Sequence, residues 1–418
     1  MKKEIKKFEM HKKPIKTNPF FQLVIWIGSK IMLSTHKYKI VKENFKKIEG
    51  GCIVVSNHMS FTDFFFLETI LCPRRSFYIV SIDEFIGKEW LMRHIGCIPK
   101  KVHYMDMALV RTMVRLLKKG NIVSLYPEAT YTFAGVTNEF DQGIGKLAKM
   151  ANVPVVVIRQ NGNYLYTPRW HTAQKNKEVP LQAYAKMVVS QEEVKQLTDK
   201  QIQERINEYF EYDDYKYQRE NNIHIKNNNL AHKIDRILYR CPHCGKEMCI
   251  EGNGNTITCK CCNAKYNINS LHILNNENGE TKFDSISDWF LWQRDSVKQE
   301  ILNGTYNITF PVKISKLING KKGFDHNFAI GEATQNEKGI FITAKTINGN
   351  EDFSFEYNEK LNSTVHLTYD VRGCQEPGFE VHNATDSYLI YPLDKTSIIK
   401  IRFAVEEAHK KYISILTK

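Results

Sequence analysis

Short apolar runs alternate with amphipathic segments over the first half of the chain. The runs at 52–56, 77–80, 122–126, 155–159 and 183–189 predict buried strands, because such runs are typical of a parallel sheet covered on both faces. Between the second and third runs, Asp106 can cap a helix whose apolar face carries Met107, Val110, Val114 and Leu117. Strands that alternate with helices indicate an α/β fold with a largely parallel sheet flanked by helices.

The pattern changes after residue 190. A polar stretch with helical hints is followed by a cysteine-rich segment, by an amphipathic helix with Trp289 and Trp292, and then by alternating strands. The dipeptides Asn319-Gly320, Lys338-Gly339 and Asn348-Gly349 favour hairpin turns, and a last helix carries Ile398 to Ala408. We therefore expect an α/β domain followed by a polar helical linker, a small zinc ribbon, an amphipathic helix and a C-terminal β-rich domain closed by a helix. The expected segments are 1–34, a basic arm and interfacial helix; 35–190, the α/β domain; 191–238, the linker; 239–270, the ribbon; 271–304, the helix; and 305–418, the β-rich module.

The N-terminal arm combines lysines with an apolar run from Pro19 to Leu33. A spanning helix needs about 20 apolar residues, and this run is shorter and is interrupted by Gln22, Ser29 and Lys30. We expect an interfacial helix that lies on an anionic membrane surface, which would place the protein peripherally on the cytoplasmic face. A helix packed in the core of its own domain is the alternative, and it stays open.

The net charge of +13 favours polyanionic partners, either an anionic membrane or nucleic acid. A chain that is simply rich in lysine has the same charge. Nucleic acid is the less favoured partner, because the basic residues are dispersed and the cysteine-rich hairpin is neither lysine-rich nor aromatic.

Two polar loops follow predicted strands and so open at the same edge of the sheet. In the first, Asp63 can reach back to the imidazole of His58, hold one tautomer and stabilise the imidazolium formed when His58 takes a proton. In the second, Glu128 can hydrogen-bond an acceptor hydroxyl and Thr130 can orient the loop. A histidine with an aspartate five residues on is common by chance, so the convergence of two loops carries the prediction of a site.

These loops resemble the motifs of the acylglycerolphosphate (lysophospholipid) acyltransferase superfamily. Its first motif, Asn-His-x-Ser-x-x-Asp, is matched by Asn57, His58, Ser60 and Asp63, and its third, Phe-Pro-Glu-Gly-Thr-Arg, by Pro127, Glu128 and Thr130. The segment 96–101 stands where the second motif belongs, and Val153-Pro154-Val155 resembles the fourth. The resemblance covers roughly residues 35–190.

The resemblance implies transfer of an acyl group from acyl-CoA or acyl carrier protein to a lysolipid acceptor, with no metal in the chemistry. His58 would be the general base and Asp63 its orienting partner. The matching positions imply a substrate-binding set made of Asn57, Ser60, Lys100, Lys101, Glu128 and Thr130.

Two departures put the acceptor in question. Ala129 replaces the glycine of the third motif, and Tyr131 stands where the arginine that holds the acceptor's phosphate is expected. Lys100 or Lys101 can supply positive charge in its place, but without the bidentate fork of arginine. An ordinary solvated pair of lysines is equally compatible with the sequence.

Six of the ten cysteines fall between residues 241 and 262, which indicates a metal site in a reducing compartment rather than a disulfide framework. Two Cys-x-x-Cys knuckles can place four thiolates around one tetrahedral Zn²⁺ with no open position, and so form a structural site. Its expected ligands are Cys241, Cys244, Cys259 and Cys262. Cys249 and Cys261 fall outside this register and are expected to be bystanders, although Cys261 can substitute for a neighbour.

Two other functions stay open. The protein can be a lipid-binding scaffold that keeps the acyltransferase fold without turnover, or a nucleic-acid binder that uses the ribbon. The C-terminal region faintly resembles a pleckstrin-homology or related lipid-binding module, and a small β domain that only packs against the rest explains its pattern equally well.

Overall fold

The computed structural model describes residues 8–45, 48–101, 106–140, 142–277, 279, 281–319, 323–369, 376–383 and 385–416. Residues 1–7 of the basic arm and Gly320 of the first predicted turn lie outside these ranges. Internal contacts divide the chain into two units, which we describe separately. The first runs from the N-terminal arm to Lys100 and from Asp106 to Ile225, and the second comprises Lys101 and the chain from Lys226 onward.

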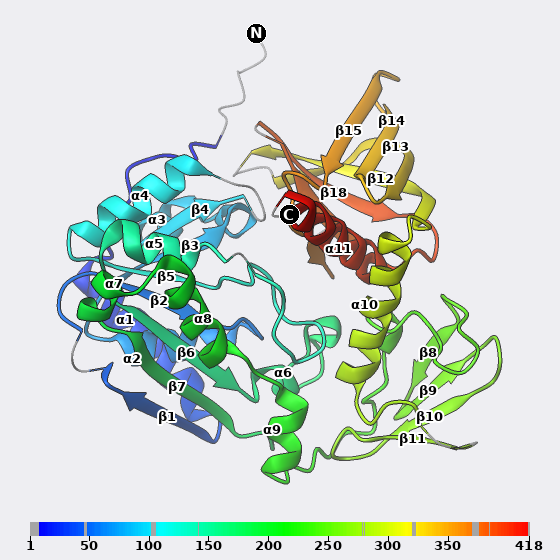
Figure 1. Ribbon diagram of the computed structural model, residues 1–418, viewed down its shortest axis with the longest axis horizontal. Helices are drawn as coiled ribbons and strands as arrows, with labels where there is room; N and C mark the ends of the chain where they lie inside the picture. Colours follow the sequence, from blue (N-terminus) through cyan, green and yellow to red (C-terminus); the bar gives the residue numbers. More distant parts are fainter. Residues whose placement is uncertain are drawn as a thin grey trace. The chain divides into compact units, whose positions relative to one another are not determined.

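The first unit is built on a seven-stranded sheet in the order β1-β7-β6-β2-β5-β3-β4 (Figure 1). Strands β6, β2, β5, β3 and β4 are mutually parallel, whereas β7 runs antiparallel to β6 and pairs in parallel with the edge strand β1. The strands are β1 (Tyr38–Glu43), β2 (Cys52–Ser56), β3 (Ser76–Ser81), β4 (Cys97–Lys100), β5 (Ile122–Leu125), β6 (Val155–Asn161) and β7 (Leu181–Val189). The predicted, largely parallel sheet is confirmed.

Helices cover both faces of this sheet. From β2 to β3 the chain moves along the sheet in one direction and from β4 to β5 in the other, so right-handed crossovers place α2 and α4 on opposite faces. Asp106 caps α4 as predicted, and its carboxylate accepts the N–H groups of Ala108 and Leu109. The helices are α1 (Pro19–Ser34), α2 (Thr62–Leu71), α3 (Glu89–His94), α4 (Met107–Lys118), α5 (Ile144–Ala151), α6 (Asn163–Tyr166), α7 (Gln191–Gln196), α8 (Asp199–Phe210) and α9 (Asp214–Glu220).

The polar segment after residue 190 packs into this unit through a few apolar side chains. Val194 of α7 and Ile202, Ile206 and Phe210 of α8 are buried in one cluster with residues of the central strands and of α4 and α5. The N-terminus of α8 is fixed by Thr198 and Gln201, which exchange side-chain and backbone hydrogen bonds.

Helix α1 buries two polar side chains and exposes six apolar ones. Gln22, Ser29 and Leu33 are buried, and the Gln22 amide donates to the buried Glu68 of α2 at 2.9 Å. The exposed apolar side chains are Phe20, Leu23, Val24, Ile27, Ile31 and Met32. In the described part of the chain, no helix has both the length and the apolar character needed to cross a membrane.

The second unit contains two antiparallel sheets and two long helices. A four-stranded sheet in the order β11-β10-β9-β8 forms the cysteine-rich part. A seven-stranded sheet follows in the order β15-β14-β13-β12-β18-β17-β16, with the closing helix α11 (Figure 1). Its elements are β8 (Ile250–Asn253), β9 (Thr256–Cys259), β10 (Lys265–Ile268), β11 (Leu274–Asn276), α10 (Ile286–Leu302), β12 (Asn307–Asn319), β13 (Gly323–Asn336), β14 (Gly339–Thr346), β15 (Asp352–Asn358), β16 (His366–Thr368), β17 (Gly378–His382), β18 (Ser387–Pro392) and α11 (Ile398–Leu416).

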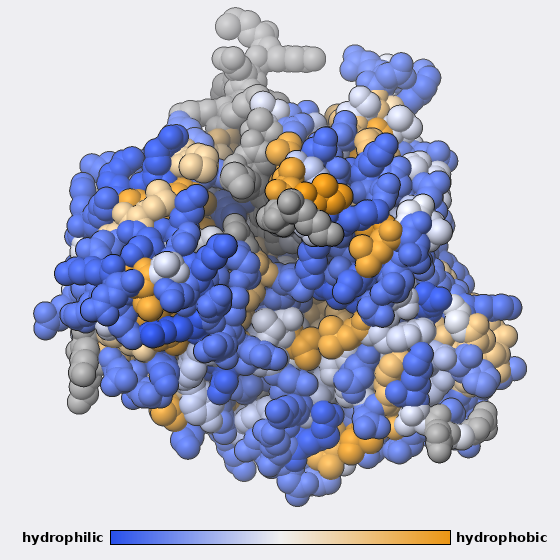
Figure 2. Space-filling model, in the orientation of Figure 1, coloured by the Kyte–Doolittle hydropathy of each residue, from blue (hydrophilic) through white to orange (hydrophobic). Residues whose placement is uncertain are grey.

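The predicted small sheet, C-terminal β-rich domain and closing helix are confirmed. Helices α10 and α11 are joined by buried charges, because Arg294 pairs with Glu406 and with Glu407. Lys400 of α11 pairs with Glu247 of the cysteine-rich part at 2.8 Å. The solvent-facing surface drawn in Figure 2 is mostly hydrophilic, and its hydrophobic residues gather in small separate patches.

Candidate functional site

His58 and Asp63 form a hydrogen-bonded pair at the carboxyl end of β2. The Nδ1 atom of His58 lies 3.0 Å from Oδ2 of Asp63, and the same oxygen accepts the backbone N–H groups of Met59 at 2.6 Å and Ser60 at 3.0 Å. Asp63 is fully buried in the first turn of α2, whereas the His58 side chain is 20% exposed. Because Nδ1 faces the carboxylate, Nε2 is the ring atom that can exchange a proton with a substrate.

A residue that sequence reasoning missed completes the environment of Asp63. The Nδ2 atom of Asn163, at the start of α6, donates to Oδ1 of Asp63 at 2.6 Å and to Oε1 of Gln160 at 2.8 Å. Strand β6, which leads into Asn163, is the parallel neighbour of β2. The carboxyl ends of parallel neighbours meet at one edge of the sheet, so the position of Asn163 just after a buried strand is the signal that would have found it.

Glu128 joins the two predicted loops. Its Oε2 accepts the backbone N–H of His58 at 2.8 Å, and its Oε1 accepts the N–H of Asn138 at 2.7 Å and the hydroxyl of Tyr212 at 3.0 Å. In addition, Thr132 N–H donates to the carbonyl of His58 at 2.8 Å. Three protein donors thus surround a carboxylate that is 1% exposed, and this carboxylate fixes the loop that carries His58.

The imidazole of His58 lies between two tyrosine rings. Its centroid is 4.1 Å from that of Tyr126, with an interplanar angle of 17°, and 4.0 Å from that of Tyr131, with an angle of 30°. The guanidinium of Arg169 lies over the Tyr131 ring, 5.0 Å from its centroid. Burial raises the pKa of both tyrosines, so their hydroxyls stay protonated at neutral pH. The imidazole thus has an aromatic face on each side.

The other predicted substrate-binding residues occupy different places. Asn57 bridges β2 to β6, since its amide group both donates to and accepts from the backbone of Gln160. Ser60 hydrogen-bonds Thr62 through its hydroxyl, and Thr130 is buried in the second loop. Lys100 ends β4, three strand spacings or roughly 14 Å from β2. Lys101 donates to the carbonyl of Asn383 at 3.0 Å.

Comparison with known proteins agrees with this geometry. Residues 37–159 match the family model described as Acyltransferase. This chain contains an acyltransferase domain. His58, Asp63 and Glu128 lie inside the matched residues, whereas Asn163 and Arg169 lie beyond them.

The acyltransferase domain is similar to named 1-acyl-sn-glycerol-3-phosphate acyltransferases. Chloroplastic enzymes from Brassica napus and Arabidopsis thaliana are each 32% identical over 129 residues, which is 29% of this chain and 36% and 34% of theirs. The enzyme from Bacillus subtilis (strain 168) is 27% identical over 128 residues, 29% of this chain and 60% of its own. The chain thus matches about a third of each plant relative and less than two thirds of the bacterial one.

Among solved structures, the 1-acyl-sn-glycerophosphate acyltransferase of Thermotoga maritima is similar to 46% of this chain and 79% of its own, with 20% sequence identity and a TM-score of 0.34.

The second loop of the acyltransferase domain contains one residue in the left-handed region. Ala129 has a φ of 54°. This conformation costs an alanine about 1 kcal/mol and is natural for glycine, which the resemblance placed at this position. Ala129 therefore has a backbone conformation that the glycine of the motif would adopt without this cost.

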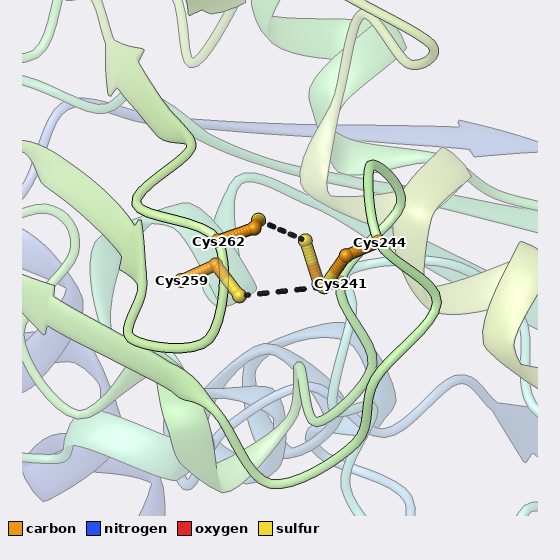
Figure 3. Close-up of side chains that lie close together, drawn as sticks. All are labelled: Cys241, Cys244, Cys259 and Cys262. Carbon is orange, nitrogen blue, oxygen red and sulfur yellow. Dashed lines mark hydrogen bonds between the residues drawn. The ribbon is translucent and has the colours of Figure 1, made fainter.

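The second unit brings the four predicted metal ligands together. The Sγ atoms of Cys241, Cys244, Cys259 and Cys262 all lie within 4.8 Å of one another, and they point toward one another from two loops (Figure 3). The separations between Cys241 and Cys262 and between Cys244 and Cys259 are 3.8 Å. A tetrahedral zinc ion with Zn–S bonds of about 2.3 Å separates its sulfurs by about 3.8 Å, so the donor set and its spacing fit Zn²⁺.

The two cysteines expected to be bystanders are paired with each other. Cys249 and Cys261 form a disulfide, with their Cα atoms 5.7 Å apart. This pairing corrects the expectation that the cysteine-rich segment contains only metal ligands and bystander thiols. It arises because Cys249 directly precedes β8 and Cys261 follows β9, and these two strands pair antiparallel.

Proposed function

We propose that the acyltransferase domain transfers a fatty acyl group from an acyl thioester, acyl-CoA or acyl carrier protein, to the hydroxyl of a lysophospholipid such as acylglycerol-3-phosphate. Such a reaction would serve phospholipid biosynthesis or remodelling. The observation that carries the proposal is the pairing of His58 Nδ1 with Asp63, which leaves Nε2 for the substrate, inside residues that match an acyltransferase family.

The chain's own residues account for each proton movement. Nε2 of His58 takes the proton of the acceptor hydroxyl as its oxygen attacks the thioester carbonyl carbon. Asp63 stabilises the imidazolium that forms, which lies between the rings of Tyr126 and Tyr131. The carbon–sulfur bond then breaks, and the departing thiolate takes the proton back from Nε2. An ester and a free thiol result, and the histidine is restored.

The substrate-binding residues belong to this proposal in two ways. The contacts of Asn57, Ser60 and Glu128 support a role in shaping the loops around His58. Lys100 lies at the carboxyl edge of the same sheet, and we propose that it contacts the far end of a long acceptor.

An anionic membrane surface is the proposed location of the reaction. The exposed apolar side chains of α1 would enter the headgroup region, and the exposed Lys12, Lys13 and Lys16 just before the helix would face anionic lipid. Trp90 of α3 is 64% exposed and contacts Phe21 of α1, with ring centroids 6.0 Å apart, so the apolar surface continues beyond the helix. A cytoplasmic-face, peripheral enzyme would meet both a lysolipid and a water-soluble donor there.

We assign the four cysteines of the second unit to one structural Zn²⁺. When bound, the ion would join the two knuckles through four Zn–S bonds, two from each knuckle, with thiolates at all four of its positions. The proposed acyl transfer uses none of these cysteines.

The decisive experiment offers the purified protein a C16 acyl-CoA or acyl carrier protein together with several lysolipids and detects diacyl products by mass spectrometry. We expect product with the wild type and a loss of at least about 1000-fold in the variant His58→Ala. His224→Ala removes an exposed histidine of the same unit and is the matched control. Wild-type product no greater than that of His58→Ala would favour the scaffold function. Binding of DNA or RNA that is lost when the ribbon is deleted would favour the nucleic-acid function.

A further inference from the structure

Arg169 is the outermost member of a four-layer stack, and the proposed mechanism does not use it. The stack runs from Tyr126 through His58 and Tyr131 to Arg169. Arg169 comes from a short 3₁₀ turn, Arg169–His171, that follows α6 and lies outside the four motifs. A segment distant in sequence therefore places a guanidinium on the far side of Tyr131 from His58.

The charge of Arg169 has no carboxylate counterpart among the residues that the structure describes. The side chain is half-buried, and its guanidinium lies over the face of Tyr131. Two other poorly exposed arginines are neutralised, since Arg93 pairs with Glu89 at 2.8 Å and Arg402 with Glu406 at 2.7 Å. A partly desolvated guanidinium that faces a site without a carboxylate partner is suited to an anionic ligand.

The position of Arg169 corresponds to the charge that the third motif lacks. Tyr131 stands where an arginine is expected, and Arg169 lies directly on its ring. The guanidinium thereby comes within 9.0 Å of the imidazole, by the two ring distances of 5.0 and 4.0 Å. One substrate molecule can therefore contact both the guanidinium and the imidazole.

We propose that Arg169 binds a phosphate group of the substrate across the edge of Tyr131, while His58 faces the reacting hydroxyl or thioester. This assignment rests on the proposed function and makes it specific, because it names a phosphate-bearing substrate. The phosphate can belong to the acceptor, as in an acylglycerol phosphate, or to the phosphopantetheine of the donor. In either case planar, bidentate recognition explains an arginine rather than a lysine.

The test measures KM in matched arms with the full-length protein. Arg169→Gln is compared with wild type for acylglycerol phosphate and for monoacylglycerol, and for acyl-CoA and a phosphate-free acyl N-acetylcysteamine thioester. Loss of a charged hydrogen-bond donor would raise KM by about 10- to 100-fold for the phosphate-bearing member of one pair and leave its neutral partner within about twofold. The pair that shows the difference identifies the source of the phosphate.

Two further variants complete the design. Arg169→Lys keeps the charge without the fork and would recover only part of the affinity. Lys175→Gln removes an exposed positive charge six residues away and would leave KM unchanged. Titration of wild type and Arg169→Lys with glycerol 3-phosphate by calorimetry reports binding independently of turnover. It extends the test to a case in which Arg169→Gln does not fold.

The outcomes separate the two proposals. Wild-type protein without transfer in any arm would contradict the proposed function. Normal wild-type transfer, together with equal KM changes for phosphorylated and neutral substrates in Arg169→Gln, would overturn the role of Arg169 alone.

Discussion

The side-chain amide of Asn163 lies 2.6 Å from the Asp63 carboxylate and donates a hydrogen bond to it. Asp63 begins the helix after β2, and Asn163 follows the neighbouring strand β6. The oxygen that receives this bond is Oδ1, whereas Oδ2 faces His58, so Asn163 fixes the carboxylate from the side opposite the imidazole. We infer that Asn163 is a positioning residue that acts on the reaction through Asp63.

The substitution Asn163→Leu would test this role. Loss of a hydrogen bond to a charged group costs about 1.5 to 3 kcal/mol, so kcat would fall by about 10- to 100-fold as Asp63 loses its fixed orientation. KM for both substrates would change by less than about twofold, because Asn163 does not face them. Asn176→Leu is the control, since the buried amide of Asn176 donates to the Leu165 carbonyl in the same segment and does not contact Asp63. Equal kcat losses in both variants would show a general structural effect instead.

Glu128 offers a test of the connection between the two loops. Because its carboxylate accepts three protein donors, Glu128→Gln would point an N–H₂ group at one of them and lower the free energy of unfolding by about 1 to 3 kcal/mol. Tyr212→Phe removes one of the three bonds to this charged group and would cost about 1.5 to 3 kcal/mol. Urea denaturation measures both values. Unchanged stability in Glu128→Gln, with a raised KM for the acceptor, would instead support the direct contact with the acceptor hydroxyl that the sequence suggested.

The sequence was informative where burial is uniform along a strand. The runs 52–56 and 155–159 became β2 and β6, because continuous apolar residues have few other places in a fold. Single polar residues were less predictable. Whether Glu128 meets a substrate or the backbone of His58 depends on Tyr212, which lies 84 residues away. Likewise, nothing local to Arg169 indicates that its guanidinium lies on Tyr131.

The orientation of helix α1 also depends on a residue from another part of the chain. Its apolar residues predicted either an interfacial or a core helix, because a helical pattern does not show which face packs inward. The decision depends on the buried Glu68, which accepts hydrogen bonds from Gln22 and from Tyr78 and so draws the polar face of α1 inward.

Asp214 makes the stability of the fold depend on pH. This buried carboxylate accepts the N–H groups of Gly162 and Tyr164 at the start of α6, and burial raises its pKa from 3.8 to about 7. The folded state therefore binds more protons than the unfolded state between these values, and stability falls as pH rises through this range. The fall would be on the order of 4 kcal/mol. Urea denaturation at a series of pH values would show this slope in wild type and a flatter one in Asp214→Asn, whereas equal slopes would exclude Asp214 as the cause.

The metal assignment predicts one zinc ion per chain by elemental analysis. Cys244→Ser removes a thiolate and would lower the zinc content, and chelation would lower the thermal midpoint of the second unit, because metal binding contributes to its folding free energy. The double substitution Cys249→Ser with Cys261→Ser is the matched control, since these sulfurs bond to each other rather than to the metal site. A zinc content unaffected by Cys244→Ser would contradict the assignment.

The membrane assignment predicts that α1 binds vesicles through its apolar face and the lysines before it. Ile27 and Ile31 are 43% and 60% exposed, and each would contribute up to about 2 kcal/mol on insertion. Replacing both with serine would therefore reduce co-sedimentation with vesicles of anionic phospholipid by well over tenfold. Leu302→Ser, which changes a 50% exposed leucine at the end of α10, is the control. Binding would also weaken as salt screens the lysines. Retained binding in the double variant would show that α1 does not enter the membrane, and it would move the search to other exposed apolar residues such as Trp90.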